Sequence, residues 1–153
     1  MIEPFVEHGF VLPPSLARTI RRQVFGAAVG DGSKERPSIV KLVDGVWWTT
    51  RAVGVHIDKH PLNFITTGLV LINDRNAMLR IGDDPFRLLD IPVGTVYRLE
   101  SRLVPHGTVQ ETEGLFAFLA WDCPILDMKP VREWAMDACD ELSRLFAPWR
   151  ESE

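Results

Sequence analysis

The sequence predicts an α+β protein in which an antiparallel β core is flanked by one helix on the N-terminal side and one on the C-terminal side. Short β-rich runs follow one another from about residue 38 to residue 122, separated by polar or glycine-bearing turns. Apolar residues at helical spacing lie on either side of this range, over about 14–29 and 130–146. The chain shows no internal repeat and no linker. We therefore expect the 153 residues to form one domain, 1–153, as an antiparallel sandwich or barrel.

The first predicted helix follows a Pro-Pro-Ser sequence and covers about residues 14–29. Its apolar residues recur every four positions, at Leu16, Ile20, Val24 and Ala28. Arginines occupy another side of this helix. The glycine at position 30 ends it, because glycine accepts the left-handed conformation that follows many helices.

Seven strands are expected to form the core. Asp44-Gly45 is a favoured hairpin turn between the first two strands, and His60-Pro61 ends the second. A polar stretch, 73–76, separates the third strand from the fourth. The expected strands cover residues 39–43, 46–55, 64–72, 77–81, 86–91, 94–101 and 115–121.

The second predicted helix covers about residues 130–146 and begins with Pro130, which suits the first helical turn. Its apolar stripe consists of Val131, Trp134, Ala135, Ala138, Leu142, Leu145 and Phe146. We expect both helices to pack on the outside of the β core and to cover one face of a sheet.

Composition limits the classes of partner. A formal charge of −4 provides no electrostatic reason to expect nucleic-acid or anionic-membrane binding. No apolar run approaches the length of a membrane helix, and no N-terminal signal pattern is present, so a cytoplasmic protein is expected. Cys123 and Cys139 show no CxxC spacing and are expected to be reduced. The motifs of serine hydrolases, phosphate-binding loops and dinucleotide-binding folds are also absent from the sequence.

Three residues are candidate ligands for one metal ion. The tripeptide His56-Ile57-Asp58 ends a strand-like run, and its outer residues point the same way in an extended chain. His106 follows a later strand and a proline. Two imidazoles and one carboxylate that leave other coordination positions open suit iron(II) and its oxygen chemistry.

With these motifs the chain resembles the iron(II)- and 2-oxoglutarate-dependent oxygenases, especially their prolyl-hydroxylase-like members, from about residue 54 to residue 121. The segments that carry the resemblance are 56–58, 64–74, 92–97, 105–107 and 114–121. The resemblance implies a double-stranded β-helix, a jelly-roll or cupin-like barrel with the metal in its mouth. It also implies that His56, Asp58 and His106 hold iron(II), and that 2-oxoglutarate is the co-substrate of a hydroxylation.

One position departs from the family pattern. Relatives of this kind carry an arginine or lysine about ten residues beyond the second histidine, where it pairs with the far carboxylate of 2-oxoglutarate, and this chain has Phe116 there. Arg80 is the preferred substitute on another strand, followed by Arg98 and Arg102. Trp48 and Tyr97, with Trp47 beside them, are expected to line a substrate pocket. Thr108 and Glu111 are expected to orient the His106 imidazole.

The sequence is compatible with three functions. The first is an iron(II)- and 2-oxoglutarate-dependent dioxygenase, and the second is a cupin-like metal enzyme that does not use 2-oxoglutarate. The third is a β-helix binding module without catalysis. The sequence selects neither a small-molecule nor a macromolecular substrate and indicates no oligomeric state.

Overall fold

The structure is a computed structural model that describes residues 4–29, 40–43, 45–59, 64–124 and 129–150. In chain order its elements are β1 (Phe5–Glu7), α1 (Pro14–Val29), β2 (Val40–Val43), β3 (Val46–Thr49), β4 (Phe64–Asn73), β5 (Met78–Ile81), β6 (Arg87–Asp90), β7 (Val96–Leu99), β8 (His106–Val109), β9 (Phe116–Pro124), α2 (Val131–Leu145) and α3 (Ala147–Arg150). The predicted α+β class with an antiparallel β core is confirmed.

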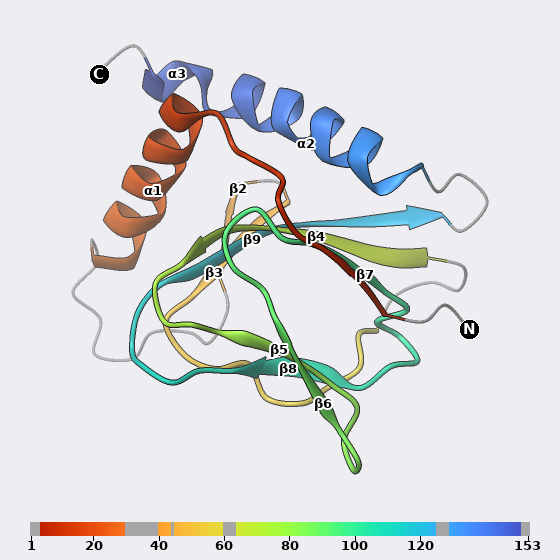
Figure 1. Cartoon of the computed structure of the whole chain (residues 1–153). Helices are drawn as coiled ribbons and strands as arrows, with labels where there is room; N and C mark the ends of the chain where they lie inside the picture. The colour runs from red at the N-terminus through yellow and green to blue at the C-terminus, as the bar shows by residue number, and fades with distance from the viewer. Residues whose placement is uncertain (1–3, 30–39, 44, 60–63, 125–128, 151–153) are drawn as a thin grey trace.

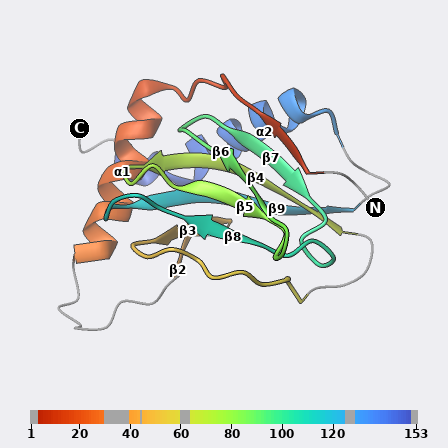
Figure 2. The same cartoon turned by 60° about the horizontal axis from the view of Figure 1, so that its bottom comes forward.

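The strands form two antiparallel sheets. One has the order β1-β7-β4-β9-β3-β2 and the other the order β6-β5-β8. The helices lie on the outer side of the larger sheet, and the smaller sheet lies on its other side (Figure 1). Figure 2 shows the same three layers after rotation. The expectation that both helices cover one face of a sheet is confirmed.

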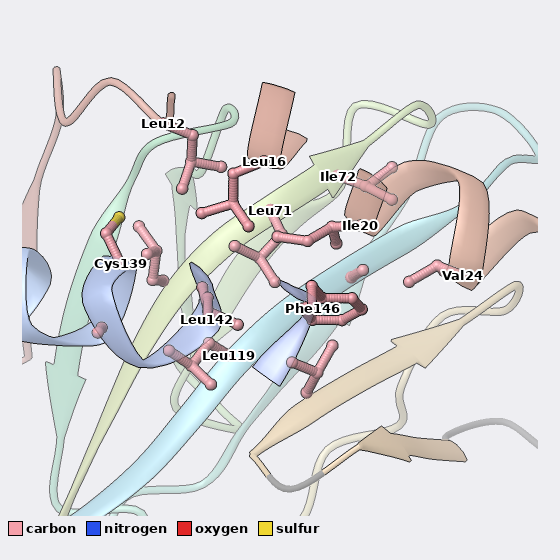
Figure 3. Close-up of a cluster of buried hydrophobic side chains, with 14 of the residues drawn as sticks. Leu12, Leu16, Ile20, Val24, Leu71, Ile72, Leu119, Cys139, Leu142 and Phe146 are labelled. Carbon is pink, nitrogen blue, oxygen red and sulfur yellow. The ribbon is translucent and has the colours of Figure 1, made fainter. Parts of the chain in front are cut away.

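One core fills the space between the helices and the larger sheet (Figure 3). Leu16, Ile20 and Val24 of α1 are fully or almost fully buried there, as their four-residue spacing predicts. Leu142 of α2 and Phe146 after it are buried in the same cluster. Burial of each such side chain contributes about 1.5–3 kcal/mol.

A second core lies between the two sheets and contains Leu79, Ile91, Tyr97, Leu99 and Phe116. Strand β9 serves both cores. Its Ala117 and Leu119 belong to the helix-side cluster, whereas Phe116 and Phe118 belong to the cluster between the sheets. This division follows from the two-residue period of a β-strand.

The second predicted strand is shorter than expected. It was predicted over 46–55, but β3 ends at Thr49. The chain then leaves the larger sheet and pairs with β8: the His56 and His106 backbones exchange N–H···O bonds of 3.0 and 2.9 Å, and the Thr108 N–H donates to the Val53 carbonyl. Pairing with a distant strand therefore overrides the local β pattern of residues 52–55.

Three further elements were not predicted, namely β1, β8 and the short helix α3. β1 has only three residues, and β8 begins with His-Gly rather than with a run of β-forming residues, so neither gives a strand signal; each gains its conformation by pairing with β7 or β5. The proposed turn residue Asp44 and the His60-Pro61 break lie outside the described residues. Among the helices that are described, none combines the length and the apolar character that crossing a bilayer requires.

Candidate metal centre

His56, Asp58 and His106 meet at one point. Their three ligand atoms all lie within 4.8 Å of one another. His56 is held by its backbone pairing with His106 of β8, and the Asp58 N–H donates to the Ser101 carbonyl at 2.9 Å. The segment that carries the first two candidate ligands is thus fixed at one end by β8 and at the other by the turn after β7, both distant in sequence.

Backbone carbonyl groups orient both imidazole rings. Nδ1 of His56 lies 2.8 Å from the Gly54 carbonyl oxygen, and Nδ1 of His106 lies 2.8 Å from that of Val104. A carbonyl can only accept a hydrogen bond, so each Nδ1 must carry the proton. Each Nε2 is then free to bind a metal, and both face the Asp58 carboxylate, at 3.2 Å for His56 and 3.7 Å for His106.

Thr108 and Glu111 were expected to orient the His106 ring, and the structure assigns Thr108 a different contact. Its hydroxyl accepts a 2.9 Å hydrogen bond from the Val53 N–H and so ties the segment before His56 to β8. Glu111 is exposed. The sequence did not predict that backbone carbonyl groups orient the two imidazoles, because a carbonyl group carries no sequence signal. For both histidines, the carbonyl belongs to the residue two positions earlier in the chain.

The donor set fits a cation. When both imidazoles are neutral, three lone-pair atoms converge without a hydrogen-bond donor among them, and a metal ion at their centre would satisfy all three. The His106 side chain is only 12% exposed. Burial lowers the pKa of His106 and outweighs the opposing effects of the Val104 carbonyl and the Asp58 charge. His106 is therefore neutral, and able to bind a metal, at neutral pH.

A cavity of about 750 Å³ adjoins the three ligands. Its lining is mostly apolar and includes the aromatic side chains of Trp47, Tyr97 and Phe118. Burial and, secondarily, the charge of Asp58 raise the pKa of Tyr97, so its phenol remains a neutral hydrogen-bond donor. Gly68 leaves room for this ring, because a Cβ atom at position 68 would lie 2.2 Å from Tyr97 Cζ.

The two residues predicted to form a substrate pocket lie in different places. Tyr97 lines the cavity, but Trp48 is buried in the core under the helices. Its neighbour Trp47 is the tryptophan of this pair that lines the cavity. The prediction that Trp48 lines a substrate pocket is therefore wrong. Adjacent residues of a strand face opposite sides of the sheet, and the sequence does not indicate which side forms the cavity.

The three arginines proposed as carboxylate anchors are absent from the described residues that line the cavity. Arg80 donates to the Asp83 carbonyl at 2.9 Å and stacks on the Phe86 ring. Arg98 alternates with Tyr97 on β7 and so projects toward the other face of the sheet, and Arg102 lies in the turn after that strand. Among the described residues that line the cavity, Lys59 is the only lysine or arginine, and it directly follows Asp58 in the chain.

Comparison with known proteins identifies no relative: no protein-family model, curated protein or solved structure matches this chain. The function is therefore inferred from the geometry of the site.

Proposed function

We propose that the protein is a non-haem iron(II) oxygenase that uses 2-oxoglutarate as co-substrate and hydroxylates its substrate. The observation that carries this proposal is the convergence of His56, Asp58 and His106 beside a large cavity. Two histidines and one carboxylate bind iron(II) on one side and leave the remaining positions for exogenous ligands. When bound in such a set, iron(II) supplies the activation of dioxygen that the side chains themselves lack.

The arrangement of the sheets supports a double-stranded β-helix. Two antiparallel sheets face each other across one core, and the ligand atoms lie beside a cavity whose lining draws on both sheets. Ligand sites at the mouth of such a barrel are common, because the strands provide rigid positions for a few polar side chains.

In this proposal, the side chains of the protein bind the metal ion, orient the substrate and shield it from water. Asp58 provides one negative charge close to the dication, and the two neutral imidazoles complete the set without further charge. Trp47 and Phe118 exclude water from one side of the cavity and provide flat apolar surfaces for a substrate. The neutral hydroxyl of Tyr97 can donate a hydrogen bond to an oxygen atom of a bound ligand.

One observation favours a second candidate, a cupin-like metal enzyme that does not use 2-oxoglutarate. Phe116 occupies the position of the usual basic anchor, and Arg80, Arg98 and Arg102 are not among the described residues that line the cavity. Such an enzyme would bind the same ion through the same three ligands but would be indifferent to 2-oxoglutarate.

Anaerobic titration of the full chain with iron(II), followed by 2-oxoglutarate, tests the proposal. We expect one iron per chain, then the weak visible charge-transfer band of the iron–oxoacid chelate, and on admission of oxygen the formation of succinate. His106→Ala should abolish iron binding. His8→Ala is the matched control, because that exposed imidazole bonds to Thr95 and lies outside the cluster.

The other outcomes separate the alternatives. Iron binding without the band would support the metal enzyme that does not use 2-oxoglutarate. No iron binding at all would contradict both enzyme proposals and favour a binding module.

A further inference from the structure

Aromatic side chains of the larger sheet form one wall of the cavity. Trp47 of β3 and Phe118 of β9 are directly opposite each other in the antiparallel register, so both side chains point to the same face. Phe116, two residues earlier on β9, points to that face as well, and its ring centroid lies 5.5 Å from that of Phe118. All three residues line the cavity. Three neighbouring rings therefore present one aromatic surface to it.

Aliphatic side chains line the cavity from the side of the smaller sheet. Leu79 of β5 and Ile91, which directly follows β6, are buried in the core between the two sheets and belong to the lining. An aromatic surface that faces aliphatic side chains forms a slot. A planar molecule makes more contacts in such a slot than a rounded one, and an aromatic ring also stacks favourably on other aromatic rings.

The charged groups of the described lining are Asp58, Lys59 and Glu141. Asp58 belongs to the candidate metal centre, and the exposed Lys59 directly follows it in the chain. Glu141 forms an ion pair with Arg144. None of these three groups is an unpaired cation buried in the slot, so an anionic molecule would gain no counter-charge from the described residues there.

The threonine hydroxyl groups of the lining are engaged in hydrogen bonds. Oγ1 of Thr66 lies 2.6 Å from Oγ of Ser101, and the Thr108 hydroxyl accepts its bond from the Val53 N–H. A bound molecule with several polar groups would leave some of them without partners beside the aromatic wall, which is unfavourable. The slot therefore favours a molecule that is mostly apolar.

We propose that this cavity binds a small, uncharged molecule with a planar aromatic ring system. The cavity volume of about 750 Å³ lies within the range of roughly 300–1,000 Å³ at which pockets enclose most of a small molecule. The role of this molecule as the substrate rests on the proposed function, whereas its binding does not.

A matched pair of alcohols tests the assignment. 2-Naphthol and decahydro-2-naphthol share their carbon skeleton and hydroxyl group, and both are uncharged at neutral pH, but only the first is planar and aromatic. Calorimetry with the metal-free full chain should show 2-naphthol binding about threefold to tenfold more tightly. Naphthalene-2-sulfonate has the same rings and a negative charge, and it should bind about tenfold more weakly than 2-naphthol.

Phe118→Leu should reduce the affinity for 2-naphthol about threefold to tenfold and leave that for decahydro-2-naphthol nearly unchanged, because leucine is apolar but not flat. Trp47→Leu should act in the same way. Phe25→Leu is the matched control and should keep the full preference, since Phe25 is exposed on α1 and is not among the described lining residues. In the unaltered chain, nuclear Overhauser effects should connect the 2-naphthol and Trp47 ring protons.

Four results would overturn this assignment: no binding of 2-naphthol, equal affinity for the two alcohols, tighter binding of the sulfonate, or bound 2-naphthol without contacts to the Trp47 ring. A preference that both Phe118→Leu and Trp47→Leu leave unchanged would also contradict it. The Overhauser contacts need no variant, so the test does not depend on how the variants fold.

Manganese(II) provides a separate test of the substrate role. In the manganese-loaded chain, the paramagnetic ion should strongly broaden the resonances of bound 2-naphthol, and His106→Ala should abolish this effect. Bound 2-naphthol without broadening would overturn the substrate role. Binding of 2-naphthol by a chain that takes up no metal would support the aromatic site and contradict the proposed function. Metal uptake without 2-naphthol binding would leave the proposed function intact and overturn the aromatic site.

Discussion

The two imidazoles of the candidate metal centre differ in their surroundings: the His56 side chain is 41% exposed and that of His106 is 12% exposed. Both receive the same support, a carbonyl two residues earlier that fixes the ring and leaves Nε2 free. The pattern arises because each histidine lies in extended backbone next to its partner. At this candidate metal site, backbone carbonyls rather than additional side chains orient the two histidines.

Acid should destabilise the metal-free protein through His106. Burial lowers the pKa of His106 in the folded state below its ordinary value of 6.5, so the unfolded chain binds the proton more readily. The contribution is complete above pH 6.5 and is lost as the pH falls from 6.5 through the lower folded-state pKa. Denaturant unfolding at a series of pH values should show this loss. His106→Gln should show a flatter profile over the same interval, and an unchanged slope in that variant would contradict the assignment.

Gly68 should resist substitution because of Tyr97. A Cβ atom at position 68 would lie 2.2 Å from Tyr97 Cζ, so the buried ring would have to leave its position on the wall of the cavity. We expect Gly68→Ala to reduce the free energy of unfolding by about 1–3 kcal/mol. Gly26→Ala on α1 is the matched control, since its Cβ meets nothing within 4 Å, and it should stabilise the protein by about 0.5–1 kcal/mol. Equal effects in the two variants would contradict this packing.

At the scale of elements, the segment that bears the metal pair depends on β8. Thr108 holds Val53 through both its hydroxyl and its backbone N–H. Thr108→Val keeps the shape but leaves the Val53 N–H without its side-chain acceptor. We expect metal affinity, measured by competition with a coloured chelator, to fall about tenfold, as for other groups that support metal ligands.

Leu142→Ala on α2 should have the opposite effect to Thr108→Val, because it should lower stability without changing metal affinity. Leu142 is fully buried between the helices and the larger sheet and is not among the residues that line the cavity. Its truncation should reduce the free energy of unfolding by about 2–5 kcal/mol and leave the metal Kd unchanged. If Leu142→Ala weakened metal binding as much as Thr108→Val, the two faces of the sheet would not be independent.

At the scale of the whole molecule, the metal should act as a link between the two sheets. His106 belongs to the smaller sheet, and Asp58 is tied to the turn that follows β7 of the larger one. Free metal at 100 times its Kd should add about 2.7 kcal/mol to the free energy of unfolding, which raises Tm by about 5–10 °C in a chain of this size. Thermal unfolding with and without EDTA measures the difference. His56→Ala should show no such shift, and a shift that persists in that variant would place the metal elsewhere.

Most of the secondary structure could be predicted from sequence because it depends on local periodicity. The four-residue spacing of Leu16, Ile20 and Val24 and the stripe on α2 correspond to buried helix faces. Seven of the strands were located within a few residues, apart from the early end of β3. β1 and β8 were missed because one has only three residues and the other begins with His-Gly, and both are defined by their pairing partners.

The sequence by itself indicated the candidate metal ligands: His56 and Asp58 are two residues apart, and His106 follows a recognisable strand pattern. Only the tertiary structure decided which tryptophan faces the cavity and which carbonyls orient the imidazoles. Those outcomes depend on which face of a sheet becomes enclosed and on how a turn folds back against a distant strand. Local spacing does not encode either property, because both arise from contacts between residues far apart in the chain.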